Sequence, residues 1–187
     1  MINAAELLLH PLGRYDEALA MVEDALDFAE TPNELADALL IRVDALTHVG
    51  RRDEATHLLG SIDTSALDAP HLPFLLGRAA FELGDAARAR PHLEQAATLE
   101  PTNPDVPYYL GLACEALLDA RQASMAFLEA RALELRMAPP PWSLPTDAFE
   151  SLVEEALKEL PEKSARAIDG ALIIVCDVPG AEVVAEG

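Results

Sequence analysis

The chain has 187 residues, with 13 Lys or Arg against 33 Asp or Glu, so its formal net charge is −20 at pH 7. Because phosphate backbones and anionic lipids bind through basic side chains, we expect neither nucleic acid nor a membrane surface as a partner. The hydrophobic fraction of 51% excludes a disordered acidic chain and indicates a globular protein.

The N-terminal segment Met1–Glu6 has no basic residue ahead of the apolar Leu7–Leu9, so it does not resemble a secretion signal. No apolar run approaches the ~20 residues that a membrane-spanning helix needs. We interpret the two cysteines, Cys114 and Cys176, as buried thiols of a reducing compartment, although a disulfide between them stays open. These features favour a cytoplasmic location.

One short pattern, which begins with Gly or Leu and ends with Ala, occurs at 13–18, 50–55, 84–89 and 118–123. Its closing alanines are 37, 34 and 34 residues apart. A period of 34 residues is typical of a repeat made of two helices, A and B, that stack on those of the next repeat. The spacing therefore predicts an all-α helical solenoid of about four helix pairs.

Caps and hydrophobic periodicity predict the helices of this array. The expected A and B pairs are 2–10 with 14–30, 33–49 with 51–60, 70–83 with 85–99, and 104–117 with 119–136. Asn33 and either Thr102 or Asn103 are interpreted as N-caps, and Pro104 stands where a first-turn proline is tolerated. Three extra residues near 30–33 are expected to lengthen the first B helix or its turn.

The third and fourth repeats carry small residues where paired helices would cross, and the third closes with a proline. These positions are Leu76-Gly77, Ala89, Ala96 and Pro101, then Leu110-Gly111, Ala123, Phe127 and Ala130. Gly or Ala at a crossing lets two backbones approach closely. In these positions the chain resembles the tetratricopeptide repeat (TPR) family, and the resemblance covers about residues 1–136. It implies a protein-binding scaffold whose A helices line a concave groove.

The first two repeats depart from that pattern. Arg42-Val43 and Ala5-Glu6 stand at the Leu-Gly positions, and Pro11 would end the first helix early. An irregular first repeat is expected either where it caps the stack or where preceding repeats have been lost.

Counting from Gly77 and Gly111, one face of each A helix is predicted to bind a protein or peptide partner. The candidate groove residues are Asp37, Leu40, Asp44, His71, Phe74, Arg78, Phe81, Tyr108, Leu112 and Glu115, with Asn3, Leu7, His10 and Thr47 on the same face. Phe74, Phe81 and Tyr108 are expected as apolar anchors, and the alternative role for Phe74 and Phe81 is packing between helices.

Members of one TPR subclass bind the acidic tails of chaperones through a carboxylate clamp. The clamp has Lys and Asn on the first A helix and basic residues on the third. The matching positions here are Asn3, Leu7, His71 and Leu75, so the clamp is absent. With Arg78 as its main cation among several carboxylates, the groove is expected to prefer a basic and apolar peptide.

The proline-rich run 139–145 cannot continue a helix and is interpreted as a stiff linker. It separates a TPR array at 1–138 from an incomplete α/β appendage at 146–187. An amphipathic helix is predicted at 146–160, with Thr146 as its N-cap.

A buried strand is predicted at 171–176. Because a lone strand leaves its backbone unpaired, we expect it to be disordered, to pair with Val183-Val184, or to form a homo-oligomer by docking on a second copy. The helix, the strand and the following Asp177-x-Pro179 resemble the start of the minimal zincin-like metallopeptidase family, over about 146–180. The resemblance implies an alternative: the chain is the non-catalytic regulatory or substrate-recruiting front of such an enzyme, truncated before its catalytic helix.

That family holds zinc on a later His-Glu-x-x-His helix, and this motif does not occur in the chain. The histidines are at least nine residues apart: His10, His48, His57, His71 and His92. Phosphate-binding glycine loops, Gly-x-Ser-x-Gly elbows and Cys-x-x-Cys pairs are also missing. We therefore expect no metal, no cofactor and no catalytic residue, and favour an interaction module over an enzyme.

Overall fold

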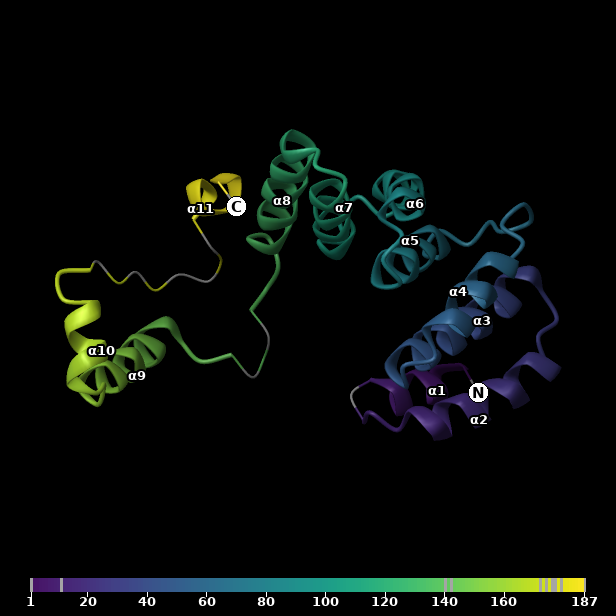
Figure 1. The fold of residues 1–187 in the computed structure, drawn as a ribbon, viewed down its shortest axis with the longest axis horizontal. Coiled ribbons are helices and arrows are strands. Elements are labelled where there is room, and N and C mark those ends of the chain that lie inside the picture. Colours follow the sequence, from purple (N-terminus) through teal and green to yellow (C-terminus); the bar gives the residue numbers. More distant parts are fainter. Residues whose placement is uncertain are drawn as a thin grey trace.

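The computed structural model describes residues 2–10, 12–139, 141, 143–171, 173, 175, 178 and 180–186, and within them the chain is helical and contains no strand. The first eight helices form four consecutive pairs: α1 (Ile2–Leu9) with α2 (Tyr15–Asp27), α3 (Pro32–His48) with α4 (Arg52–Ser61), α5 (Leu72–Glu82) with α6 (Ala86–Leu99), and α7 (Asp105–Ala116) with α8 (Ala120–Glu134). Each odd-numbered helix also packs on the next odd-numbered one, so the pairs stack in a row (Figure 1). The predicted solenoid of four helix pairs is confirmed.

The turn inside each repeat has one residue with a left-handed backbone, always at the same position of the repeat. The φ angles are +64° at Gly13, +80° at Gly50 and +90° at Gly84, positions where the absence of a Cβ removes the steric penalty. In the fourth repeat the position is held by Leu118, with φ +61°. Its side chain is 92% exposed, so no packing compensates for the strained backbone.

The small residues of the repeat lie at helix crossings, as predicted. The closing alanines, Ala18, Ala55, Ala89 and Ala123, are all buried. A Cβ on Gly77 of α5 would lie 2.6 Å from Leu93 Cγ of α6. A Cβ on Gly111 of α7 would lie 2.5 Å from Phe127 Cε1 of α8. These two helix pairs are therefore closer than any side chain at the glycine positions would allow.

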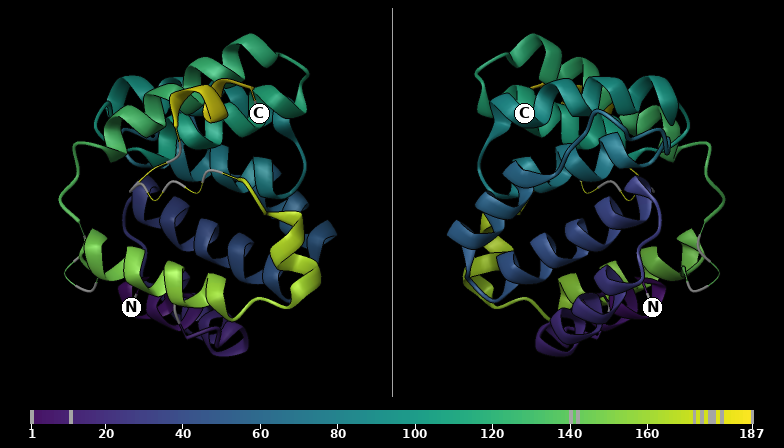
Figure 2. Two further views of the ribbon diagram at one scale, coloured as in Figure 1. Left: turned by 90° about the vertical axis from the view of Figure 1, so that its left-hand side faces the viewer. Right: turned by 90° about the vertical axis from the view of Figure 1, so that its right-hand side faces the viewer.

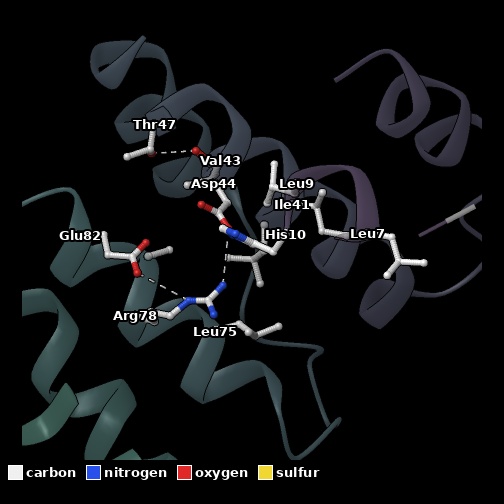
Figure 3. Close-up of a pocket in the computed structure, with 12 residues that line it drawn as sticks. Leu7, Leu9, His10, Ile41, Val43, Asp44, Thr47, Leu75, Arg78 and Glu82 are labelled. Carbon is white, nitrogen blue, oxygen red and sulfur yellow. Dashed lines mark hydrogen bonds and ion pairs between the residues drawn. The ribbon is translucent and has the colours of Figure 1, made fainter. Parts of the chain in front are cut away.

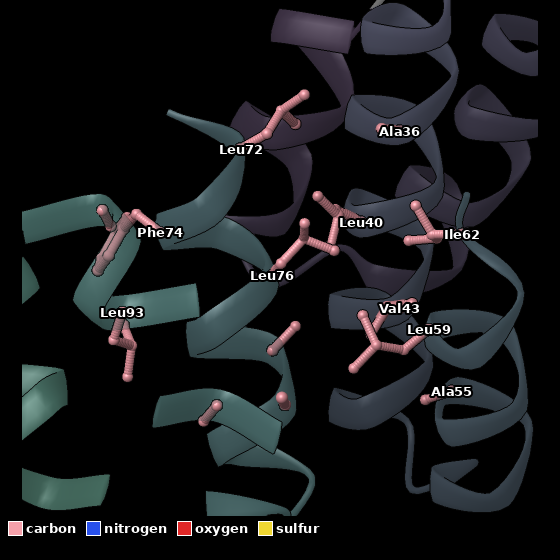
Figure 4. Packing of buried hydrophobic residues seen from close by; sticks show 14 of the residues in the cluster. Ala36, Leu40, Val43, Ala55, Leu59, Ile62, Leu72, Phe74, Leu76 and Leu93 are labelled. Carbon is pink, nitrogen blue, oxygen red and sulfur yellow. The ribbon is translucent and has the colours of Figure 1, made fainter. Parts of the chain in front are cut away.

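One hydrophobic core runs through the middle of the stack, from α3 to α7 (Figure 4). Leu72, Val106 and Leu93 are fully buried in it, and Leu40 and Leu59 are nearly so. Two smaller clusters join α1 and α2 to α3. The N-terminal repeat is thus fixed to the second repeat by apolar packing.

Three local expectations in the array were wrong. The N-cap of α7 is Pro104, which makes no side-chain cap hydrogen bond, and not Thr102 or Asn103. The extra residues of the 37-residue interval do not lengthen the first B helix, because α2 has 13 residues and α6 has 14. They lie in α3, which has 17 residues against 11 in α5. The N-cap of α3 is Thr31 and not Asn33: Thr31 and Glu34 form a capping box around Pro32. Asn33 instead accepts hydrogen bonds from the backbone of Asp68 and Ala69.

Beyond the solenoid lie α9 (Thr146–Lys158), α10 (Glu162–Ala167) and α11 (Ala181–Glu186). The amphipathic helix is confirmed, although its N-cap is Pro145 and it buries none of its residues. Val183 and Val184 belong to α11, which packs on α8, so the expectation that they form a partner strand was wrong (Figures 1 and 2).

Within the predicted strand, Leu172, Ile174 and Cys176 lie outside the described residues, and the described Ala171, Ile173 and Val175 are not in a strand. Cys114 is a buried free thiol, and burial raises its pKa. No helix in the described part of the chain combines the length and apolar character needed to cross a membrane.

Candidate functional site

Two adjoining hollows of about 520 and 590 Å³ lie among the A helices, and we call them together the concave pocket. They share five residues from three elements: His10 after α1, Asp44 and Thr47 of α3, and Arg78 and Glu82 of α5. The remaining wall is mostly apolar and consists of Leu7, Leu9, Leu40, Ile41, Val43, Leu75 and Ala79, with His48 and Tyr109 on the second hollow. Figure 3 shows Arg78 reaching from α5 toward Asp44 and Glu82.

Asp44 lies at the centre of the polar side of the pocket and is 8% exposed. Its Oδ2 atom is 3.1 Å from His10 Nε2 and 3.6 Å from Arg78 Nη2. Its Oδ1 atom is 2.9 Å from His48 Nδ1. That nitrogen, however, donates its hydrogen to the Asp44 carbonyl oxygen, 3.0 Å away. Asp44 Oδ1 is therefore buried without a hydrogen-bond donor.

Arg78 is shared between two carboxylates, because its Nε atom also lies 3.8 Å from Glu82 Oε1. Tyr109 donates its hydroxyl hydrogen to the same Glu82 oxygen over 3.0 Å. Burial, followed by the negative charge of Glu82, raises the pKa of Tyr109 to about 12. The guanidinium carbon of Arg78 lies 5.9 Å from the centre of the Phe74 ring. The polar side of the pocket thus connects Asp44, Arg78, Glu82 and Tyr109 through ion pairs and a hydrogen bond, and the Phe74 ring packs against Arg78.

The structure brings part of the predicted groove together. Leu40, Asp44 and Arg78 line the concave pocket, as do Leu7, His10 and Thr47 from the same predicted face. Asp37 and His71 form a separate pair, with Asp37 Oδ1 2.9 Å from His71 Nε2. Leu112 and Glu115 are not among the residues that line the pocket, and the side chain of Asn3 lies outside the described residues.

The aromatic anchors are placed differently from the expectation. Phe74 is 8% exposed and belongs to the core, so helix packing is its role. Phe81 is half-buried, with its ring centre 6.0 Å from that of Tyr109. Tyr108 is exposed, and the centre of its ring lies 6.1 Å from that of Phe127 in α8. The pocket is lined by the neighbouring residue, Tyr109.

Three residues of the polar side were missed by the sequence analysis. Glu82 follows Arg78 by four residues and His48 follows Asp44 by four, so helical spacing places each pair on one face. That signal could have found both. Tyr109 could not be separated from Tyr108 without knowing the rotation of α7 about its axis.

Known tetratricopeptide proteins share this fold. A family model described as "Tetratricopeptide repeat" matches residues 74–103, which include α6 and most of α5. The structure "MamA MSR-1 C2" is 27% identical, with a TM-score of 0.56 and coverage of 71% of each chain. "MamA AMB-1 C2221" is 26% identical, with a TM-score of 0.54 over 71% of this chain and 73% of that one.

"Crystal structure of YrrB: a TPR protein with an unusual peptide-binding site" has a TM-score of 0.54 at 21% identity and covers 90% of this chain and 81% of that one, a likeness of fold alone. A search of curated proteins gives no significant match. The array is thus a TPR-type solenoid. The family match does not include 146–187, so the resemblance of that segment to zincin-like metallopeptidases stays a prediction.

Proposed function

We propose that this TPR-type solenoid is a non-catalytic protein-interaction module that binds a peptide segment in the concave pocket. The preferred segment carries Lys or Arg next to an apolar side chain. The observation that supports this choice is the composition of the pocket, in which an apolar wall adjoins a polar side with more carboxylates than cations.

The charge balance favours a basic ligand. Arg78 is the one permanent cation that lines the concave pocket in the described part of the chain, and Asp44 and Glu82 both lie within 4 Å of it. One carboxylate charge is therefore in excess. A net charge of −20 over the chain adds a long-range field that attracts cationic segments and raises their association rate.

The apolar wall supplies the contact area that a lone ion pair lacks. Leu7 is 61% exposed at the edge of the pocket, and Leu75 is half-buried beside it. A peptide side chain placed between them would remove apolar surface from water, worth about 25 cal/mol for each Å² buried. Exposed surface charges alone contribute about 0–1 kcal/mol. We therefore expect an apolar anchor to supply most of the affinity and the basic residue to supply orientation.

The experiment is selection of a random displayed peptide library on the purified chain, followed by affinity measurement of the enriched peptides by fluorescence anisotropy. We expect enrichment of Lys or Arg beside an apolar residue. Glu82→Gln, which keeps the shape but removes the charge, should weaken binding about fivefold, equivalent to about 1 kcal/mol. The matched control is Glu129→Gln on α8, an exposed carboxylate outside the pocket. Enrichment of acidic peptides, or equal loss in both variants, would refute the proposal.

A further inference from the structure

His10, Asp44 and His48 come together although the two histidines are 38 residues apart in the sequence. Each offers one ligand atom, and these atoms all lie within 4.8 Å of one another. The two imidazole rings meet edge to face, with their centres 5.3 Å apart. Among the described residues, this is the one such group of three side chains able to hold a metal ion.

We propose that His10, Asp44 and His48 bind one divalent transition-metal ion of the Zn²⁺ or Co²⁺ class. Two imidazole nitrogens and one carboxylate are ligands that these borderline ions prefer, whereas Ca²⁺ and Mg²⁺ prefer oxygen alone. The proposal does not rest on the peptide-binding proposal, because its ligands are all side chains of this chain. A bound dication would cancel the excess carboxylate charge of the concave pocket, so peptide binding is measured with a chelator present.

The ligands have to approach one another when the ion binds. Zinc binds nitrogen and oxygen at about 2.0–2.2 Å in tetrahedral geometry, so two ligands of one ion are about 3.4 Å apart. The side chain of His10 is 57% exposed and has room to rotate toward that distance. His48 is held in place by its hydrogen bond to the Asp44 carbonyl and by stacking on Tyr15.

The buried carboxylate is the second observation that points to a cation. Asp44 Oδ1 is shielded from water and accepts no hydrogen bond. A buried carboxylate oxygen without a donor is unfavourable, and a metal ion at this position would satisfy it. While His48 Nδ1 donates its hydrogen to the Asp44 carbonyl, that nitrogen has no lone pair for a metal, so the ring would bind the ion through Nε2, in the arrangement common for metal-bound histidines.

Arg78 opposes the ion, since its Nη2 atom lies 3.6 Å from Asp44 Oδ2 and its charge repels a second cation. The metal affinities of two kinds of variant should therefore change in opposite directions. Removing a ligand should weaken metal binding, whereas removing the Arg78 charge should strengthen it. A set of histidines that collects metal on the surface without forming a site would not respond to Arg78.

The test is titration of the untagged full chain with ZnCl₂ against a chromogenic chelator, and with CoCl₂ monitored by its visible absorption. We expect one equivalent in the wild type and at least about tenfold weaker binding in His10→Ala and His48→Ala. Arg78→Gln should bind more tightly, and His57→Ala on α4 should match the wild type. Circular dichroism would verify that each variant is folded.

The proposal is overturned if the wild type binds less than one equivalent, if His57→Ala lowers affinity as much as His10→Ala and His48→Ala, or if Arg78→Gln leaves the affinity unchanged. Both histidine variants replace exposed side chains, so loss of the fold is not expected to obscure the result. Because the probes are metal ions alone, failure here leaves the peptide-binding proposal standing, and failure of that proposal leaves this one standing.

Discussion

Replacing Gly77 by Ala tests whether close helix approach holds the third repeat together. The new methyl group would lie 2.6 Å from Leu93 Cγ, 2.9 Å from Leu93 Cδ2 and 3.2 Å from the Leu93 backbone nitrogen. Leu93 is fully buried, and one of the three contacts is backbone, so a change of rotamer alone cannot relieve the clash. Helices α5 and α6 would have to move apart.

The expected loss of stability is the difference between two effects. Overpacking a core typically costs about 1–3 kcal/mol. Replacing Gly by Ala inside a helix stabilises the helix by up to about 1 kcal/mol, because Ala has the higher helix propensity. Subtracting the gain leaves about 0–2 kcal/mol, and the contacts of 2.6 and 2.9 Å put Gly77→Ala near the upper end, so we expect it to lower the free energy of unfolding by about 2 kcal/mol. The matched control is Gly60→Ala in α4, where the nearest atom is Arg88 Nη1 at 3.8 Å, an ordinary contact. That variant should be as stable as the wild type or more stable.

Urea unfolding followed by far-ultraviolet circular dichroism measures the stability of both variants. A third variant, Leu93→Ala, should cost about 2–5 kcal/mol alone because it opens a cavity. The double variant with Gly77→Ala should lose less stability than the two single variants lose together, since the cavity accepts the methyl group. A Gly77→Ala protein as stable as Gly60→Ala, or strict additivity with Leu93→Ala, would refute the reasoning.

Three further outcomes are expected. Leu118→Gly should raise the free energy of unfolding by about 0.5–1 kcal/mol, because it relieves a left-handed residue without losing packing, and an unchanged urea midpoint would contradict this. Absorbance titration should show one tyrosine with a pKa of about 12 that disappears in Tyr109→Phe. Because the pKa of Tyr109 is raised on folding, its contribution to stability is present below about pH 10 and is lost as pH rises through about 12. If Tyr109→Phe and the wild type unfolded identically at alkaline pH, this prediction would be wrong. Finally, residues 1–138 alone should fold cooperatively, with at most a modest loss from removing α11, and a non-cooperative melting curve would show that the appendage is essential.

Local features of the sequence were enough to predict the solenoid. The interval between Ala55, Ala89 and Ala123 gave the repeat, and proline, glycine and cap residues gave helix bounds close to the observed ones, because these signals act over a few residues. The glycines at 77 and 111 predicted the crossings, since only a small residue permits such an approach. Where a signal was shared by neighbours, as with Thr31 and Asn33, the sequence could not decide which side chain caps the helix.

The concave pocket depended on the tertiary structure. Helical register placed Asp44 and Arg78 on the inner face, but whether Tyr108 or Tyr109 faces the pocket is set by the rotation of α7, which the packing of its whole buried side determines. His10 meets Asp44 because α1 packs on α3 through apolar contacts and not because of any motif. Separation along the chain indicated that the histidines act singly. Their distance in space is set by helix stacking, a sum of many small contacts that no short stretch of sequence contains.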